Sequence, residues 1–261
     1  MADNAENMSF LAHLEQLRRV LQKVLAGFLI ACLLCWPLSE RALAALLRYA
    51  APEGFQLHYF ALMEPFVARL EVTAFLALVL SLPWSGWCLW RFLEPALKRE
   101  ERGPVLRAAL AMGVLALTGA ALALGFIVPA LMRFSLSFAT PEMRPVIGIG
   151  DFTGLVLLVM LAAMALFQFP LLLYLLLLVG VLDVEQLRRK RPQVIVAIFV
   201  LAALFSPPDV LSQLLLAAPA WLLFEAGMVY FNRRFPVSRE PDEVYREAGG
   251  TGTDQNDGEG A

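Results

Sequence analysis

The residue types that commonly support catalysis are scarce in this sequence and stand far apart. The two histidines, His13 and His58, are separated by a long apolar run, and no H-E-x-x-H, G-x-S-x-G or phosphate-binding glycine loop is present. Cys32 and Cys35 form a C-x-x-C inside that run, without the basic neighbour that activates a thiol. These patterns argue against a zinc protease, a serine hydrolase and an ATPase, and they predict no catalytic residue, no metal site and no cofactor.

Three polar residues stand well inside apolar runs: Gln168, Gln213 and Glu225. A charged residue at the centre of a membrane-spanning helix costs roughly 2.5–3.5 kcal/mol, so a carboxylate there is expected to have a partner or a function. Glu225 lies within about two turns of the block Asn232-Arg233-Arg234. A carboxylate paired with arginine near the interface and a contact for a partner helix are both compatible with this position.

Gln168 is followed by Phe169 and Pro170 in the middle of an apolar run. Proline lacks the N–H that a helix needs, so Pro170 leaves one backbone carbonyl without its usual donor. The Gln168 amide could donate to that carbonyl. We therefore expect a kink here, either purely structural or part of a contact with a partner helix.

The elements that must position these residues are runs without charge. Hydrophobic residues make up 59% of the 261 residues and charged residues only 17%, whereas soluble domains have about a quarter charged residues. A helix that crosses about 30 Å of hydrocarbon needs about 20 residues. We predict an all-α polytopic membrane protein whose single domain, 1–235, has six transmembrane helices over about 20–39, 70–91, 106–132, 152–181, 193–206 and 210–231.

The last two predicted spans are joined by Ser206-Pro207-Pro208, which ends a helix. The fifth span is short, and local thinning of the bilayer is expected around it. Two crossings are still required, because basic clusters both precede the fifth span and follow the sixth. Ser206 and Gln213 flank this hairpin near the outer face, where either an intrachain hydrogen bond or a partner helix would satisfy them.

The distribution of basic residues predicts the orientation of the chain. With six spans, 16 of the 21 Lys and Arg residues fall on the side that also holds both termini. Such an excess marks the cytoplasmic side, so both termini are predicted to be cytoplasmic. The acidic tail 236–261 cannot bury apolar surface and is expected to be disordered. The net charge of −2 indicates no nucleic-acid partner.

Several blocks of the sequence, taken together, have the pattern of one known family. The first block is His13-Leu14-Glu15-Gln16-Leu17-Arg18-Arg19-Val20-Leu21. The others follow in order over about 10–231: Pro83, Trp90–Leu97 with Glu101-Arg102, Leu187–Pro192, Ser206–Gln213 and Phe224-Glu225. Together they resemble the TatC proteins of the twin-arginine translocase, whose H-L-x-E-L-R-x-R-L opening is similar to the first block.

The resemblance implies a concave bundle of six helices in the bacterial inner membrane. TatC proteins bind the signal peptides of folded proteins at the cytoplasmic face, dock the single-span subunits TatA and TatB, and work in a complex, here a homo-oligomer, driven by the proton-motive force. Twin-arginine signal peptides present guanidinium groups, which pair with carboxylates. The expected signal-binding residues are Glu101, Glu15, Gln16, Arg18 and Arg102, and the expected docking residues are Ser206, Asp209, Gln213, Gln168 and Glu225.

Two departures from the family pattern leave alternatives open. Gln16 stands where the family has a glutamate, with Glu15 one place earlier, and Gln168 stands where the family often has a mid-membrane glutamate. A scaffold paralogue with reduced signal recognition is one alternative. A small-molecule secondary transporter is another, although the sequence has no visible internal repeat and the third and fourth spans hold no ionisable group.

Overall fold

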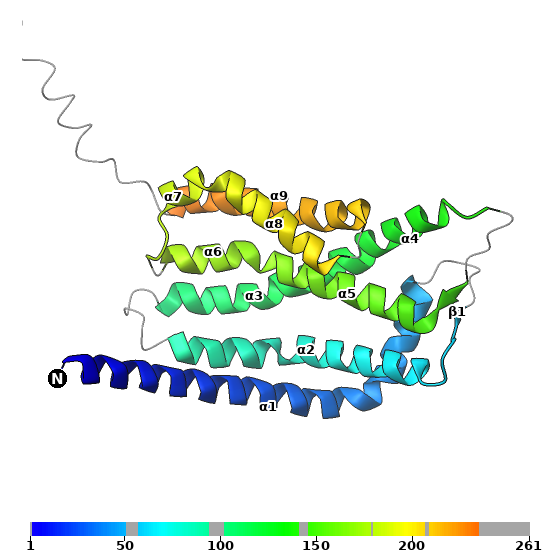
Figure 1. The fold of residues 1–261 in the computed structure, drawn as a ribbon, viewed down its shortest axis with the longest axis horizontal. Coiled ribbons are helices and arrows are strands. Elements are labelled where there is room, and N and C mark those ends of the chain that lie inside the picture. The colour runs from blue at the N-terminus through cyan, green and yellow to red at the C-terminus, as the bar shows by residue number, and fades with distance from the viewer. Residues whose placement is uncertain are drawn as a thin grey trace, which may run out of the picture.

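The computed structural model describes residues 2–50, 57–93, 102–140, 146–178, 180–206 and 209–234. The described chain consists of helices and one short pair of strands (Figure 1). The elements in order are α1 (Ala2–Ala50), β1 (Leu57–His58), α2 (Glu64–Leu93), α3 (Arg102–Leu122), the π-helical turn η2 (Ala123–Ile127), α4 (Val128–Leu136), β2 (Ile147–Gly148), α5 (Ile149–Phe167), α6 (Phe169–Leu178), α7 (Val184–Arg189), α8 (Arg191–Phe205) and α9 (Val210–Arg234).

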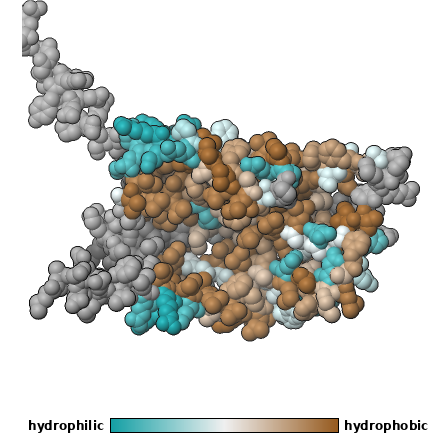
Figure 2. Space-filling view, viewed as in Figure 1, coloured by the Kyte–Doolittle hydropathy of each residue, from teal (hydrophilic) through white to brown (hydrophobic). Residues whose placement is uncertain are grey.

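Most of these helices are long and apolar enough to cross a membrane. Five segments of the described chain meet that condition by length and composition: Glu15–Ala50, Glu64–Leu89, Leu110–Leu136, Ile149–Leu178 and Val210–Arg233. The apolar helix α8 is shorter, with 15 residues. Figure 2 shows hydrophobic side chains over most of the middle of the molecule and hydrophilic ones gathered towards its ends. The predicted all-α, polytopic membrane fold of roughly six helices is confirmed.

The helices pack around α5, which contacts α2, α3, α8 and α9. Small residues allow the backbones to approach closely, as is usual between helices in membranes. A Cβ added to Gly119 of α3 would lie 2.8 Å from the Ala163 carbonyl oxygen of α5. Large side chains fill the remaining space, and Ile127, Phe152 and Phe224 are fully buried. The core is therefore apolar and closely packed on both sides of α5.

The bundle has two ends, which we call inner and outer. The inner end holds the N-terminal part of α1 and α7, and the outer end holds β1 (Figure 1). At the outer end β1 pairs in parallel with β2, Leu57 opposite Ile147. The Glu64 carboxylate accepts hydrogen bonds from the backbone N–H groups of Phe60 (2.7 Å) and Gly150 (2.7 Å). This outer bracket, Glu64 with its backbone donors, joins the start of α2 to the start of α5.

Candidate functional site

The N-terminal part of α1 holds three of the predicted signal-binding residues at the inner end. Glu15, Gln16 and Arg18 are all exposed. The Glu15 carboxylate is 2.6 Å from the guanidinium of Arg19, one helical turn later. Both side chains are more than half exposed, so the pair contributes little to stability. Glu15 is thus partly neutralised by its own helix.

The other two predicted signal-binding residues belong to the segment between α2 and α3. Glu101 lies outside the described residues, and Arg102 begins α3 without a described side chain. The Glu101 position therefore stays a prediction. In the described chain the inner ends of α1 and α2 line a cavity.

This cavity, the inner-end pocket, has a volume of about 580 Å³. Three of its lining side chains are cationic, and its described lining contains no carboxylate. The lining residues are Gln16, Arg19, Val20 and Lys23 of α1 and Trp84, Trp87, Cys88 and Arg91 of α2.

One wall of the inner-end pocket is fixed by close packing. The indole Nε1–H of Trp84 donates a hydrogen bond to the Lys23 carbonyl oxygen at 3.0 Å. A Cβ at Gly27 would lie 2.4 Å from the Trp84 ring, so only glycine leaves room for the indole against α1. Trp84 therefore holds the two helices together at a defined distance.

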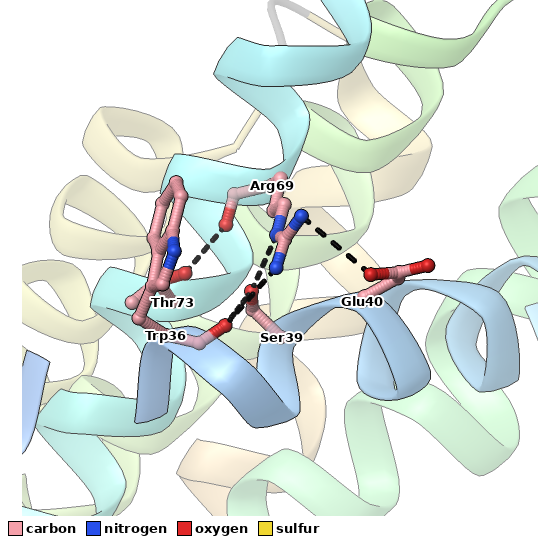
Figure 3. Close-up of polar contacts among 5 residues, drawn as sticks. All are labelled: Trp36, Ser39, Glu40, Arg69 and Thr73. Atoms are coloured by element: carbon pink, nitrogen blue, oxygen red, sulfur yellow. Dashed lines mark hydrogen bonds and ion pairs between the residues drawn. The ribbon is translucent and has the colours of Figure 1, made fainter. Parts of the chain in front are cut away.

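A polar cluster joins α1 to α2 nearer the outer end (Figure 3). The Arg69 guanidinium donates to the Ser39 hydroxyl oxygen at 3.0 Å and to the Trp36 carbonyl oxygen at 3.4 Å, and it is 3.6 Å from the Glu40 carboxylate. It also lies over the Trp36 ring, 4.7 Å from the ring centre, and Thr73 donates to the Arg69 carbonyl. The sequence analysis did not single out Arg69, which lies just before the predicted span 70–91. Its partners indicate a structural role.

The predicted kink in the fourth span is present between α5 and α6. Gln168 follows α5, which ends at Phe167, and its backbone N–H donates to the Ala165 carbonyl oxygen at 3.0 Å. The side-chain Nε2 donates to the carbonyl oxygens of Met164 (3.3 Å) and of Met112 on α3 (3.2 Å). The Gln168 side chain therefore does not serve the Leu166 carbonyl that Pro170 leaves without its donor. It links the break in the helix to α3.

Glu225 of α9 is paired with arginine, but the arginine comes from another helix. Arg191 at the start of α8 donates to both carboxylate oxygens, with Nε 2.9 Å from Oε1. The Trp221 indole donates to the same Oε1 at 3.1 Å. Arg233, which lies nearer in sequence, is not the partner that the described chain shows. The pair joins the inner ends of α8 and α9.

The polar residues of the hairpin between α8 and α9 also have partners within the chain. Asp209 accepts a hydrogen bond from the Ser212 backbone N–H at 2.7 Å and caps the start of α9. The Gln213 Nε2 donates to the Phe199 carbonyl of α8 at 3.1 Å. The Ser206 backbone N–H donates to the Ala202 carbonyl. The Asp-x-x-Ser spacing could have indicated the cap, and the buried Ser212 was missed.

Glu71 of α2 is a further intramembrane carboxylate that the sequence analysis passed over. Its Oε2 is buried without a hydrogen-bond partner in the described chain, 3.8 Å from where a Cβ on Gly154 would lie. The hydroxyl of neighbouring Thr153 is buried in the same way. Glu71 lies at the start of the predicted span 70–91, just before a run without charge from 72 to 90, so the sequence analysis did not single it out. Its position two turns after Glu64, on the same helix, was the signal that could have found it.

Comparisons with known proteins agree in one family. Residues 12–219 match the family model described as Sec-independent protein translocase protein (TatC). A protein of that name from Azotobacter chroococcum is 34% identical over 242 residues, covering 92% of this chain and 94% of the relative. The namesake from Escherichia coli K12 is 31% identical, covering 87% and 89%. A crystal structure titled Twin Arginine Translocase Receptor TatC, in DDM, matches with a TM-score of 0.75 and 26% identity, covering 84% and 98%.

These matches extend over the described helices from α1 to α9 and through both segments that hold the predicted signal-binding residues. TatC proteins are components of a protein translocase in a membrane and not enzymes. The absence of catalytic motifs from the sequence fits that description. By its family model, its relatives and its fold, this chain belongs to the TatC family of Sec-independent protein translocase proteins.

Proposed function

We propose that this TatC protein is the receptor subunit of its translocase, binding twin-arginine signal peptides of folded proteins at the inner end. The observation that supports this most is the match to a solved TatC receptor, which the chain covers over 98% of its length. The proposal places the protein in the bacterial inner membrane, in a homo-oligomeric complex with TatA- and TatB-type single-span subunits. Export is then driven by the proton-motive force.

The chemistry of binding depends on carboxylates at the inner end. A twin-arginine signal presents two permanently charged guanidinium groups, which form bidentate hydrogen bonds with carboxylates. Glu15 already shares its charge with Arg19, and the inner-end pocket has no described carboxylate in its lining. Glu101, supported by Glu15, Gln16, Arg18 and Arg102, is therefore the group on which the proposal depends most.

Photo-crosslinking of a twin-arginine signal peptide to the protein in native membranes tests this proposal. Crosslinking should be strong with the natural chain and should fall at least tenfold with Glu101→Gln, since a hydrogen bond to a charged group contributes roughly 1.5–3 kcal/mol. Glu185→Gln is the matched control, because Glu185 is paired with Arg189 on α7 at a distance from α1. A peptide with Lys-Lys in place of Arg-Arg controls for charge alone.

The same experiment separates the alternatives. No crosslinking to the natural chain would favour the scaffold paralogue or the secondary transporter. Crosslinking that Glu101→Gln leaves unchanged would remove Glu101 from the binding site while keeping the receptor function.

Docking of the single-span subunits is proposed on the surface of α8 and α9. Val196, Val200 and Leu204 recur every four residues along α8 and are all exposed, which gives an apolar stripe. Gln213, Asp209 and Glu225 are bonded within the chain, so we propose that they hold the α8–α9 hairpin in the shape that a partner helix recognises.

The remaining two predicted docking residues stand at the ends of helices. Ser206 follows α8, and Gln168 fixes the break between α5 and α6. Disulfide crosslinking from Val200→Cys to a cysteine in a TatB-type helix tests the docking surface. Leu110→Cys, exposed on α3, is the control that should not crosslink.

A further inference from the structure

The charges of the inner-end pocket are opposite to those that a cationic signal peptide requires. Arg19, Lys23 and Arg91 line it. Arg19 is paired with Glu15, whereas Lys23 and Arg91 have no ion pair with any residue that the structure describes. Two cations that face one cavity repel each other, and an anion between them would offset that repulsion. The described lining of this pocket is therefore suited to an anion.

The other side chains of the pocket indicate where the anion comes from. Trp84 and Trp87 are about half exposed, at 49% and 54%, although each lies in a helix long enough to span a membrane. Tryptophan is enriched at the boundary between headgroups and hydrocarbon, and long basic side chains reach to the same level. The pocket thus has indoles and cations at the depth of phospholipid headgroups.

The pocket is also preorganised for a ligand. The hydrogen bond from Trp84 to the Lys23 carbonyl, and the contact that requires Gly27, fix one wall beside the Lys23 backbone. A wall that is already in place loses little conformational freedom when a ligand binds.

We propose that the inner-end pocket binds the phosphate headgroup of an anionic phospholipid from the cytoplasmic leaflet. Lys23 and Arg91 pair with the phosphate, and Trp84 and Trp87 contact the glycerol and the first part of the acyl chains. Basic pockets between transmembrane helices on the cytoplasmic side are suited to such headgroups. The lipid site depends on Lys23 and Arg91 and signal binding depends on Glu101, so either proposal can fail alone; Gln16, which the signal proposal also uses, borders the pocket without a charge.

The experiment measures lipid preference by tryptophan quenching. The full chain is placed in phosphatidylcholine vesicles that contain brominated phosphatidylglycerol, and quenching is compared with that by brominated phosphatidylcholine. The natural chain should prefer phosphatidylglycerol. The double variant Lys23→Gln/Arg91→Gln should lose about tenfold or more in that preference, since each basic residue near the surface contributes about a factor of five. Thermal unfolding in the same vesicles confirms that the variant is folded.

Two matched variants locate the effect. Arg233→Gln changes one charge on α9, where Arg233 is exposed and outside the pocket, and should keep the preference. Gly27→Ala leaves every charge in place but displaces Trp84, and should lower the preference several-fold.

Three results would overturn the proposal. The first is that the natural chain shows no preference for phosphatidylglycerol. The second is that Arg233→Gln loses as much preference as the double variant, which indicates a diffuse surface charge. The third is that inorganic phosphate at millimolar concentration removes the preference, which indicates a site for the free anion.

Discussion

Polar side chains inside this bundle donate mainly to backbone carbonyls, and two glutamines donate to carbonyls of other helices. Gln168 donates to Met112 on α3, and Gln213 donates to Phe199 on α8. In hydrocarbon no water can replace such a partner, so an amide that faced lipid would stay unsatisfied. Each side-chain amide therefore fixes the distance between two helices and at the same time meets its own need for a hydrogen-bond partner.

The Gln168 hydrogen bonds make a direct prediction. Gln168→Leu removes both bonds to Met112 and Met164, and should lower the free energy of unfolding by about 1 kcal/mol, the usual contribution of an interhelical hydrogen bond in a membrane. Thermal unfolding in detergent measures the change. Gln186→Leu, at an exposed site on α7, should leave the midpoint where it is. Equal midpoints for the natural chain and Gln168→Leu would contradict this account.

The ion pair between Glu225 and Arg191 makes a second prediction about stability. Glu225→Gln weakens the contacts with Arg191 and Trp221, and about 1 kcal/mol of stability should be lost, because Arg191 is half exposed and solvent screens the pair. Denaturation in detergent is the measurement. Glu185→Gln breaks a more exposed pair on α7 and should cost less. If the two variants were equally stable, the Glu225 pair would be only a surface contact.

Gln16 makes a third prediction, which concerns signal binding. Gln16→Glu restores the carboxylate at the family position on an exposed turn of α1, and should tighten binding of a standard twin-arginine peptide about tenfold. Glu15→Gln should weaken binding less than Glu101→Gln, because Glu15 is engaged by Arg19. Peptide affinities of the three variants are compared side by side. If Gln16→Glu binds no better and Glu15→Gln abolishes binding, Glu15 has taken over the family role.

The candidate residues could be found from the sequence, but their partners could not. Gln168, Gln213 and Glu225 stand out because hydrocarbon disfavours polar groups. The partner Arg191 lies 34 positions before Glu225, at the start of a different helix, and only the packing of α8 on α9 brings them together. Glu71 was missed because spans were found as runs without charge. Such a run stops at any charged residue, whether that residue faces water or the core.

At the scale of elements, the breaks between helices were easier to predict than their ends. Pro170 correctly indicated the division between α5 and α6. The first helix, in contrast, extends over Ala2–Ala50, far beyond the apolar run that suggested a span of 20–39. Polar residues with good helix propensity continue a helix out of the membrane, and hydropathy alone does not register them. The helix also continues through Pro37, where Ser39 and Arg69 bind the neighbouring Trp36 carbonyl.

The outer bracket makes a prediction at this scale. Glu64→Gln keeps one acceptor oxygen but loses the other, so it cannot serve both Phe60 and Gly150. The amide of at least one of them should exchange with deuterium about tenfold faster, whereas amides inside α2 and α5 keep their rates. Glu40→Gln, which alters only a 3.6 Å contact with Arg69, is the control. Unchanged exchange at both amides would show that the strand pair alone closes the outer end.

The whole molecule makes a prediction about orientation. If the inner end faces the cytoplasm, a membrane-impermeant maleimide added outside cells should label Tyr59→Cys, which is exposed at the outer end, and should not label Glu240→Cys in the tail. The chain's cysteines at 32, 35 and 88 are first replaced by alanine. Labelling of position 240 from outside would reverse the orientation and move the inner-end pocket to the other leaflet.

The short α8 has an electrical consequence for the whole molecule. Its 15 residues extend over about 22 Å, against the roughly 30 Å of an ordinary hydrocarbon layer. Where the bilayer thins to match α8, the same transmembrane voltage falls over a shorter distance, and the field strength beside the α8–α9 hairpin rises by about a third. The self-energy of an ion in that thinner insulating layer is also lower. If export is driven by the proton-motive force, as proposed above, α8 marks the place where the membrane is the weakest barrier to charge.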